Sequence, residues 1–141
     1  NSPSNPDGHF YSKEELKALI EVIIEEDLFI ISDEIYDKLL YDQQEFNSMI
    51  ELFPELKDRI LIVNGMSKSY SMTGWRVGFG FANKKWIDNM AKIQSHTTSN
   101  VNTIAQYASA QALENTELEK IIQQRRKIYA NDSTDTLLGD V

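Results

Sequence analysis

Two short runs of apolar residues, 28–32 and 60–63, constrain the fold of this 141-residue chain more than any other feature. Each run is continuous rather than alternating, which is typical of a parallel strand that is buried on both faces. Ser12 and Glu15 form a capping box, and apolar residues at helical spacing follow it, so the sequence predicts a helix over 12–26. Because strands alternate with helices, we expect an α/β fold with a mostly parallel sheet flanked by helices.

The rest of the chain continues this alternation. Residues 75–82 alternate between large apolar side chains and small or charged ones, which predicts a third strand with its glycines on the same face as Arg76. Further helices are expected after Asn83, over 102–113, and from a second capping box that starts at Thr116. The polar, turn-prone stretch after Tyr129 predicts a frayed tail. We therefore divide the chain into a domain over 1–129 and a tail over 130–141.

Composition excludes several classes of function. The net charge of -8 disfavours binding to nucleic acid or to an anionic membrane surface. There are no cysteines, which rules out disulfides, thiolate zinc sites and cysteine nucleophiles, and the two histidines, His9 and His96, disfavour a histidine-rich metal site. No apolar run is long enough to span a bilayer, and no signal peptide is recognisable, so we expect a cytoplasmic protein. The turn-rich first residues, with no element before them, indicate a fragment or a chain that has lost an upstream part.

Lys68 points most directly to a chemistry. It comes just after the second apolar run, and Arg76 follows it between glycines. A lysine that is buried near a charged ligand can lose its proton and form a Schiff base, and an arginine offers a planar fork for phosphate. Together they predict a pyridoxal phosphate site. In open α/β sheets ligands bind beyond the carboxyl ends of the strands, where Asp33 is also expected.

Each candidate residue taken alone also has an ordinary structural interpretation. A lone lysine or arginine usually carries a solvated surface charge. Asp33 can cap a helix that follows it, and Tyr36 is typical of a half-buried core residue. Asn5 opens a good turn sequence, Asn5-Pro6-Asp7-Gly8. The functional interpretation therefore depends on the whole set.

As a set, the motifs resemble those of the class I/II aminotransferases, which are fold-type-I pyridoxal phosphate enzymes. Asn5-Pro6-Asp7-Gly8 is similar to the family's Asn-Pro-Thr-Gly, and Ser32-Asp33-Glu34-Ile35-Tyr36 is similar to its strand-end Asp-x-x-Tyr. Ser67-Lys68 through Gly74-Trp75-Arg76-Val77-Gly78 resembles its Schiff-base lysine signature. Within the family, Met72-Thr73-Gly74-Trp75-Arg76 and Ser95-His96-Thr97-Thr98-Ser99-Asn100 look most like the bacterial aspartate/aromatic aminotransferase branch. The resemblance implies that residues 1–129 are the central part of the family's large cofactor-binding domain.

The resemblance also implies roles for the matched residues. Lys68 would hold pyridoxal 5′-phosphate as a Schiff base and later move the proton of the substrate. Asp33 would keep the pyridine nitrogen protonated, which makes the ring an electron sink. Tyr36 and Asn5 would hydrogen-bond the ring oxygen and lower the pKa of the Schiff base.

The phosphate of the cofactor would be bound by Arg76, with Ser67 as a further hydroxyl donor. The implied reaction is transamination between an amino acid, aspartate by the branch resemblance, and a 2-oxo acid. Two alternatives stay open. One is a truncated, non-catalytic oligomeric domain, which the polar residues after Ala130 favour, and the other is a different fold-type-I reaction such as β-elimination. Since a sheet of three strands leaves apolar edges, we also expect a homo-oligomer.

Overall fold

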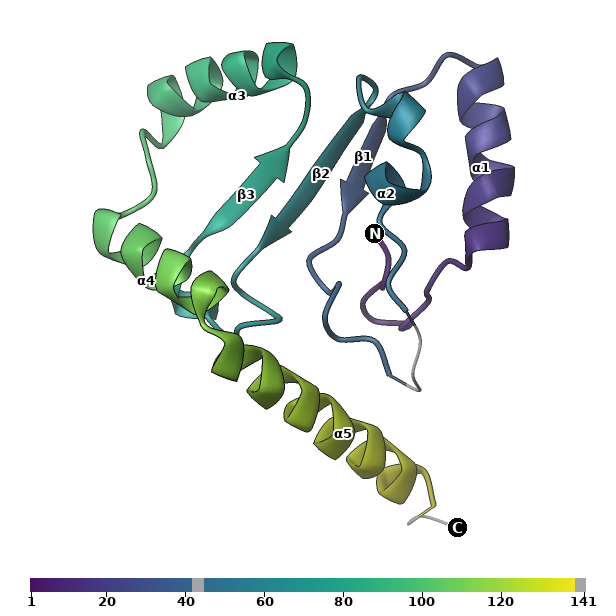
Figure 1. The fold of residues 1–141 in the computed structure, drawn as a ribbon, viewed down its shortest axis with the longest axis vertical. Coiled ribbons are helices and arrows are strands. Elements are labelled where there is room, and N and C mark those ends of the chain that lie inside the picture. Colours follow the sequence, from purple (N-terminus) through teal and green to yellow (C-terminus); the bar gives the residue numbers. More distant parts are fainter. Residues whose placement is uncertain (42–44, 139–141) are drawn as a thin grey trace.

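The computed structural model describes the backbone of residues 1–41 and 45–138, and the side chains of residues 1–41 and 45–130. Three strands form one sheet: β1 (Ile30–Asp33), β2 (Ile60–Gly65) and β3 (Gly78–Phe81), in the order β1-β2-β3. The helices are α1 (Lys13–Glu25), α2 (Met49–Leu52), α3 (Lys84–Thr97), α4 (Thr103–Glu114) and α5 (Thr116–Leu138), with 3₁₀ helices at Pro54–Leu56 and Thr73–Trp75. The predicted α/β fold is confirmed (Figure 1). Among the described helices, none is both long and apolar enough to cross a membrane.

The sheet is mixed in direction. β1 and β2 are parallel, with Asp33 beside Val63, whereas β2 and β3 are antiparallel, with Gly65 beside Gly78. The parallel pair brings the carboxyl ends of β1 and β2 to the same edge of the sheet, so the loops that follow the two strands lie next to each other. The antiparallel direction of β3 could not be predicted, because alternation with period two indicates a strand and not its direction.

The core lies between the sheet and the helices α1 and α2, which Figure 1 shows together on one side of the strands. It consists of buried apolar side chains from the helices, the 3₁₀ turn and the strands: Leu16, Ile20, Ile30, Met49, Phe53, Leu56, Ile60 and Ile62. The predicted burial on both faces holds for most of β2, where Ile60 and Leu61 are 1% and 8% exposed. For β1 it is wrong, since Ile31 is 68% exposed. β1 is an edge strand, and its second face is open in the part of the chain that the structure describes.

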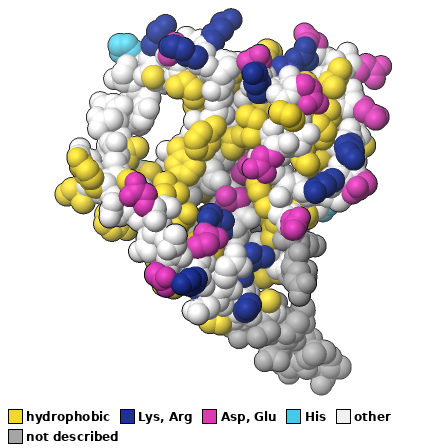
Figure 2. All heavy atoms as spheres, in the orientation of Figure 1, with side chains coloured by type: hydrophobic (Ala, Val, Ile, Leu, Met, Phe, Trp, Pro, Cys, Tyr) yellow, Lys and Arg dark blue, Asp and Glu magenta, His cyan; other side chains and the backbone are white. Residues whose placement is uncertain are grey.

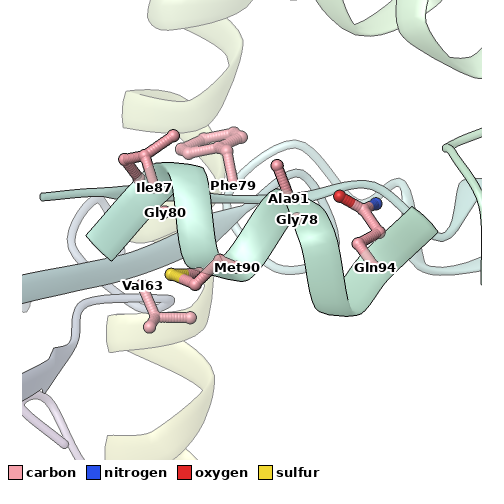
Figure 3. Close-up of a pocket in the computed structure, with 8 residues that line it drawn as sticks. All are labelled: Val63, Gly78, Phe79, Gly80, Ile87, Met90, Ala91 and Gln94. Atoms are coloured by element: carbon pink, nitrogen blue, oxygen red, sulfur yellow. The ribbon is translucent and has the colours of Figure 1, made fainter. Parts of the chain in front are cut away.

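On the other side, α3 and the strands line an open, apolar hollow of about 430 Å³. Figure 3 shows Val63 of β2 and Met90 of α3 pointing into it, beside the glycines Gly78 and Gly80 of β3. Figure 2 shows that hydrophobic side chains also reach the surface across the middle of the face drawn in Figure 1. The sheet therefore carries apolar surface that the described residues leave uncovered.

Helix ends follow local side-chain caps. Ser12 Oγ accepts the N–H of Glu15 while the Glu15 carboxylate accepts the N–H of Ser12, which confirms the first capping box. At α5 the second capping box is wrong, because the side chain of Asn115, one residue before Thr116, accepts the N–H of Glu117. The frayed tail predicted after Tyr129 is not found as far as 138, because α5 continues to Leu138. Extending an existing helix needs no new nucleus, which favours such continuation. The rest of that predicted tail, 139–141, lies outside the described residues.

The third strand is shorter than predicted. Thr73–Trp75 forms a 3₁₀ turn, Arg76 has a positive φ of 55°, and β3 begins only at Gly78. A residue in the left-handed region cannot continue a strand. The prediction that Arg76 shares a strand face with the glycines is therefore wrong.

Candidate functional site

The candidate site is built at the edge of the sheet where β1 and β2 end. Asp33 is the last residue of β1, and the N–H of Glu34 still pairs with the carbonyl of Val63 on β2. Asp33 Oδ1 accepts the N–H of Ile35 at 3.2 Å, which turns the chain sharply after the strand. Asp33 does not cap a regular helix here, because turns rather than a helix follow it. Among the described residues, its second carboxylate oxygen has no hydrogen-bond partner.

Two further candidate residues, Asn5 and Tyr36, meet beside this edge. Asn5 Nδ2 donates to the phenol oxygen of Tyr36 at 3.1 Å. The N–H of Ser2 donates to the carbonyl of Asp33 at 3.3 Å, so the N-terminal segment is held against the end of β1. The Lys68 ammonium lies over the Tyr36 ring, 5.5 Å from its centroid, within the range of a cation–π contact. Two segments distant in sequence, those of Asn5 and Lys68, therefore converge on Tyr36.

Lys68 lies in the loop that follows β2. Met66, which is fully buried, donates its N–H to the carbonyl of Val77 at 3.1 Å, and the N–H of Met72 returns to Met66 at 3.2 Å. Residues 66–72, which we call the Lys68 loop, thus form a loop whose first and last residues are hydrogen-bonded to each other, next to the start of β3. The Lys68 side chain is exposed, although the sequence argument required burial of its amine.

The Lys68 side chain borders a hollow of about 280 Å³ between its loop and α5. Ser67 also lines the hollow, together with hydroxyl groups of the same loop and Arg125 of α5. Arg125 donates to Ser71 Oγ, and Ile122 of α5 is buried at 3% exposure. The start of α5 therefore packs against the loop that carries Lys68.

Arg76 lies apart from this hollow. Its guanidinium donates to the carbonyl of Thr73 at 2.9 Å and borders a separate hollow of about 560 Å³ beside Asn100 and Asn102. The structure thus brings Asn5, Tyr36 and Lys68 together next to Asp33, with Ser67 beside Lys68. It places Arg76, which has a left-handed backbone conformation, at a different hollow from Lys68.

Comparison with known proteins decides the family. The family model described as aminotransferase class I and II matches residues 1–135. The chain belongs to the class I and II aminotransferases. It is 53% identical over 112 residues to the aspartate aminotransferase of Geobacillus stearothermophilus, covering 79% of this chain and 28% of that protein. It is 50% identical over 114 residues to the aspartate aminotransferase of Thermotoga maritima, covering 81% and 30% of the two chains.

Solved structures give the same answer. The aspartate aminotransferase of Rhizobium meliloti superposes with a TM-score of 0.89 at 37% identity, covering 93% of this chain and 32% of that one. The aromatic aminotransferase of Pyrococcus horikoshii gives a TM-score of 0.88, also at 37% identity, covering 93% and 35%. The resemblance to the aspartate/aromatic branch is therefore confirmed. This aminotransferase-family chain spans about a third or less of the length of the relatives it matches.

Sequence reasoning missed several polar residues that build the site. Asp37, Asn64 and Ser69 form a hydrogen-bonded group between the two strand-end loops. The sequence offered one signal, since Asn64 directly follows the apolar run 60–63. Glu34, 5% exposed, accepts hydrogen bonds from Ser32 Oγ, Ser48 Oγ and the N–H of Met49. Burial raises the pKa of Glu34, and these hydrogen bonds only partly oppose it.

Proposed function

We propose that this chain is the central cofactor-binding segment of a pyridoxal phosphate-dependent aminotransferase, which exchanges amino groups between an amino acid and a 2-oxo acid. One observation carries the proposal: Asn5 hydrogen-bonds Tyr36, and the Lys68 amine lies over the Tyr36 ring, next to the strand that ends in Asp33. An amine, a phenol and a carboxylate gathered where parallel strands end are the groups that this cofactor requires.

The free hydrogen-bonding capacity of these residues fits pyridoxal phosphate. One carboxylate oxygen of Asp33 accepts the N–H of Ile35, and the other can accept the N–H of the pyridine ring of the cofactor. The Tyr36 oxygen accepts from Asn5 and keeps its own proton to donate. Arg76 uses only one of its five N–H groups on the carbonyl of Thr73, which leaves donors for a phosphate.

When bound, the cofactor supplies an electron sink for the carbanion that forms at Cα of the amino acid. The side chains of this chain would do the rest. The amine of Lys68 would hold the cofactor and would serve as general base and acid for the proton at Cα of the substrate. The charge of Asp33 holds the proton on the ring nitrogen, while Tyr36 and Asn5 orient the ring through its oxygen. The Ser67 hydroxyl, beside Lys68, would bind the phosphate, and Arg76, which borders a different hollow, would have to turn its side chain toward it to take part.

We propose aspartate as the amino donor. The support is the similarity to proteins named aspartate aminotransferase. Another reaction of the same cofactor, β-elimination, would release ammonia and would not consume a 2-oxo acid. An assay with aspartate and 2-oxoglutarate, with ammonia measured in parallel, therefore separates the two reactions.

The experiment that tests the site is a visible absorbance titration with pyridoxal phosphate, followed by borohydride reduction and peptide mass spectrometry. We expect a saturable band and a reduced adduct on Lys68. Lys68→Ala should abolish both, while Lys92→Ala, at an exposed position of α3, should leave both unchanged. Adducts spread evenly over surface lysines would reject the proposal. They would favour the alternative of a non-catalytic domain, which the exposure of Lys68 already supports.

We further propose that the chain forms homo-oligomers through its sheet edges. β1 and β3 are both edge strands, and Ile31 and Phe81 on them are 68% and 56% exposed. An uncovered apolar edge tends to pair with another chain. Light scattering should give a mass above that of one chain, and Ile31→Lys should lower it. Val22→Lys, at a similarly exposed position of α1, is the control. A monomer at high concentration would contradict the proposal.

A further inference from the structure

One carboxylate joins the two loops that carry the candidate site. Asp37 Oδ2 accepts from Asn64 Nδ2 at 3.1 Å, and Asp37 Oδ1 accepts from Ser69 Oγ at 3.1 Å. Oδ1 also accepts the N–H of Lys38 at 2.7 Å. Asn64 and Ser69 are 27 and 32 residues away from Asp37 along the chain, so these contacts are tertiary. They connect the end of β1 with the end of β2 and with the Lys68 loop.

The surroundings make these hydrogen bonds strong. Ser69 is 3% exposed, and Asp37 and Asn64 are half-buried. Hydrogen bonds to an ionised carboxylate are stronger than neutral ones, and exclusion of water strengthens them further. The nearby ammonium of Lys38 forms its ion pair with Glu119 of α5. The charge of Asp37 is therefore met by hydroxyl, amide and backbone donors, and each of these has a fixed direction.

We propose that Asp37 is a positioning residue, which holds the Lys68 loop in register with the loop that carries Asp33 and Tyr36. Asp37 directly follows Tyr36, and Ser69 directly follows Lys68. The hydrogen bond between Asp37 and Ser69 therefore constrains both Tyr36 and Lys68. These two side chains are in contact, with the Lys68 ammonium 5.5 Å from the centroid of the Tyr36 ring. The importance of this distance for catalysis rests on the proposed function, whereas the connection of the two loops does not.

Asn64 provides a second hydrogen bond that restrains Asp37. Its side-chain amide donates to Asp37, while its side-chain carbonyl accepts the N–H of Gly65 at 2.7 Å. Asp37 is thus tied to the last residues of β2 and, through Ser69, to the loop that leaves β2. The hydrogen bonds from Asn64, in β2, and from Ser69, in the Lys68 loop, together restrict rotation of this loop. A single hydrogen bond would permit that rotation.

The test compares Asp37→Asn, Ser69→Ala and the double variant with the unchanged chain. Asp88→Asn is the matched control, because it removes an exposed carboxylate of α3 that pairs with Lys84. The first measurement is amide hydrogen exchange of residues 68–72, with β1 and β2 as internal references. The second is reductive labelling of Lys68 by pyridoxal phosphate, relative to Lys92.

We expect exchange in the Lys68 loop to rise about tenfold in each single variant, as fits the loss of a hydrogen bond to a charged group. Exchange in β1 and β2 should not change, and labelling of Lys68 should fall relative to Lys92. The two effects should be less than additive in the double variant, because both changes act on the Asp37–Ser69 hydrogen bond.

Three results would overturn the positioning role: behaviour equal to that of Asp88→Asn, a rise in exchange that is uniform over the strands, or fully additive effects in the double variant. Failure of the proposed function is distinguishable from these. In that case Lys68 is not labelled even in the unchanged chain, while loop exchange still decides whether Asp37 holds the loop.

Discussion

Replacing Gly65 with alanine tests how closely β3 must approach the end of β2. A Cβ at Gly65 would lie 2.7 Å from the carbonyl oxygen of Val77 and 3.1 Å from the Cα of Gly78. Both are backbone atoms, so neither can rotate away, and ordinary contact begins only at 3.4 Å. The strands must separate by the difference between 3.4 and 2.7 Å, about 0.7 Å, in an interior that has little room to deform.

Two effects set the size of the change in stability. Forcing an extra carbon into a packed site costs about 1–3 kcal/mol. Replacing glycine restricts the unfolded chain, which returns about 0.4–1 kcal/mol. We expect Gly65→Ala to lower the free energy of unfolding by about 1–2 kcal/mol. The next residue, Met66, hydrogen-bonds the same Val77 carbonyl, so the displacement should also reach the Lys68 loop and reduce labelling of Lys68.

The assay is urea unfolding followed by circular dichroism, with Lys68 labelling measured on the same samples. Gly74→Ala is the matched control, because no atom lies within 4 Å of the Cβ position and the φ of Gly74 is not in the left-handed region. We expect Gly74→Ala to be unchanged or slightly more stable. Equal urea midpoints for the two variants would refute the argument that close approach of the strands requires glycine at position 65.

Three further variants test other parts of the structure by urea unfolding. Burial raises the pKa of Glu34, so this residue favours folding below pH 4.5, its ordinary pKa, and that contribution is lost as the pH rises through the raised pKa. Glu34→Gln should make the free energy of unfolding less dependent on pH in this range, and an unchanged pH dependence would contradict the argument. Ser12→Ala removes the capping box of α1 and should cost about 1 kcal/mol, whereas no loss would mean that the cap is not needed. Met66→Ala empties a fully buried position and should cost about 2–5 kcal/mol, and a smaller loss would show that the loop collapses into the space.

Much of the frame of the site could be predicted from the sequence, because it depends on local patterns. The capping box at Ser12 and the apolar run 60–63 indicated α1 and β2, and both were found. Since parallel strands share a carboxyl edge, the positions of Asp33 and Lys68 near one edge followed from the alternation of elements. These inferences needed only the period and the ends of each element.

The parts that could not be predicted depend on backbone directions and on tertiary contacts. The left-handed conformation of Arg76 is unusual for a residue with a side chain, and nothing in the neighbouring residues indicates it. The exposure of Ile31 depends on what covers the edge strand β1, which its own sequence does not show. Asp37 and Ser69 are each ordinary polar residues after a strand, and only the folded chain brings them into contact.

Asp33 and Lys68 are held in place by different kinds of interaction. Asp33 belongs to β1, and backbone hydrogen bonds such as that from Glu34 to Val63 fix its position independently of side chains. Lys68 lies beyond the end of β2, so its position relative to Asp33 depends on the side-chain hydrogen bonds of Asp37 and on the close approach at Gly65. Substitutions at these two positions should therefore change the reactivity of Lys68 while the β1–β2 pairing around Asp33 stays intact, because the backbone hydrogen bonds between β1 and β2 need neither the Asp37 carboxylate nor a glycine at position 65.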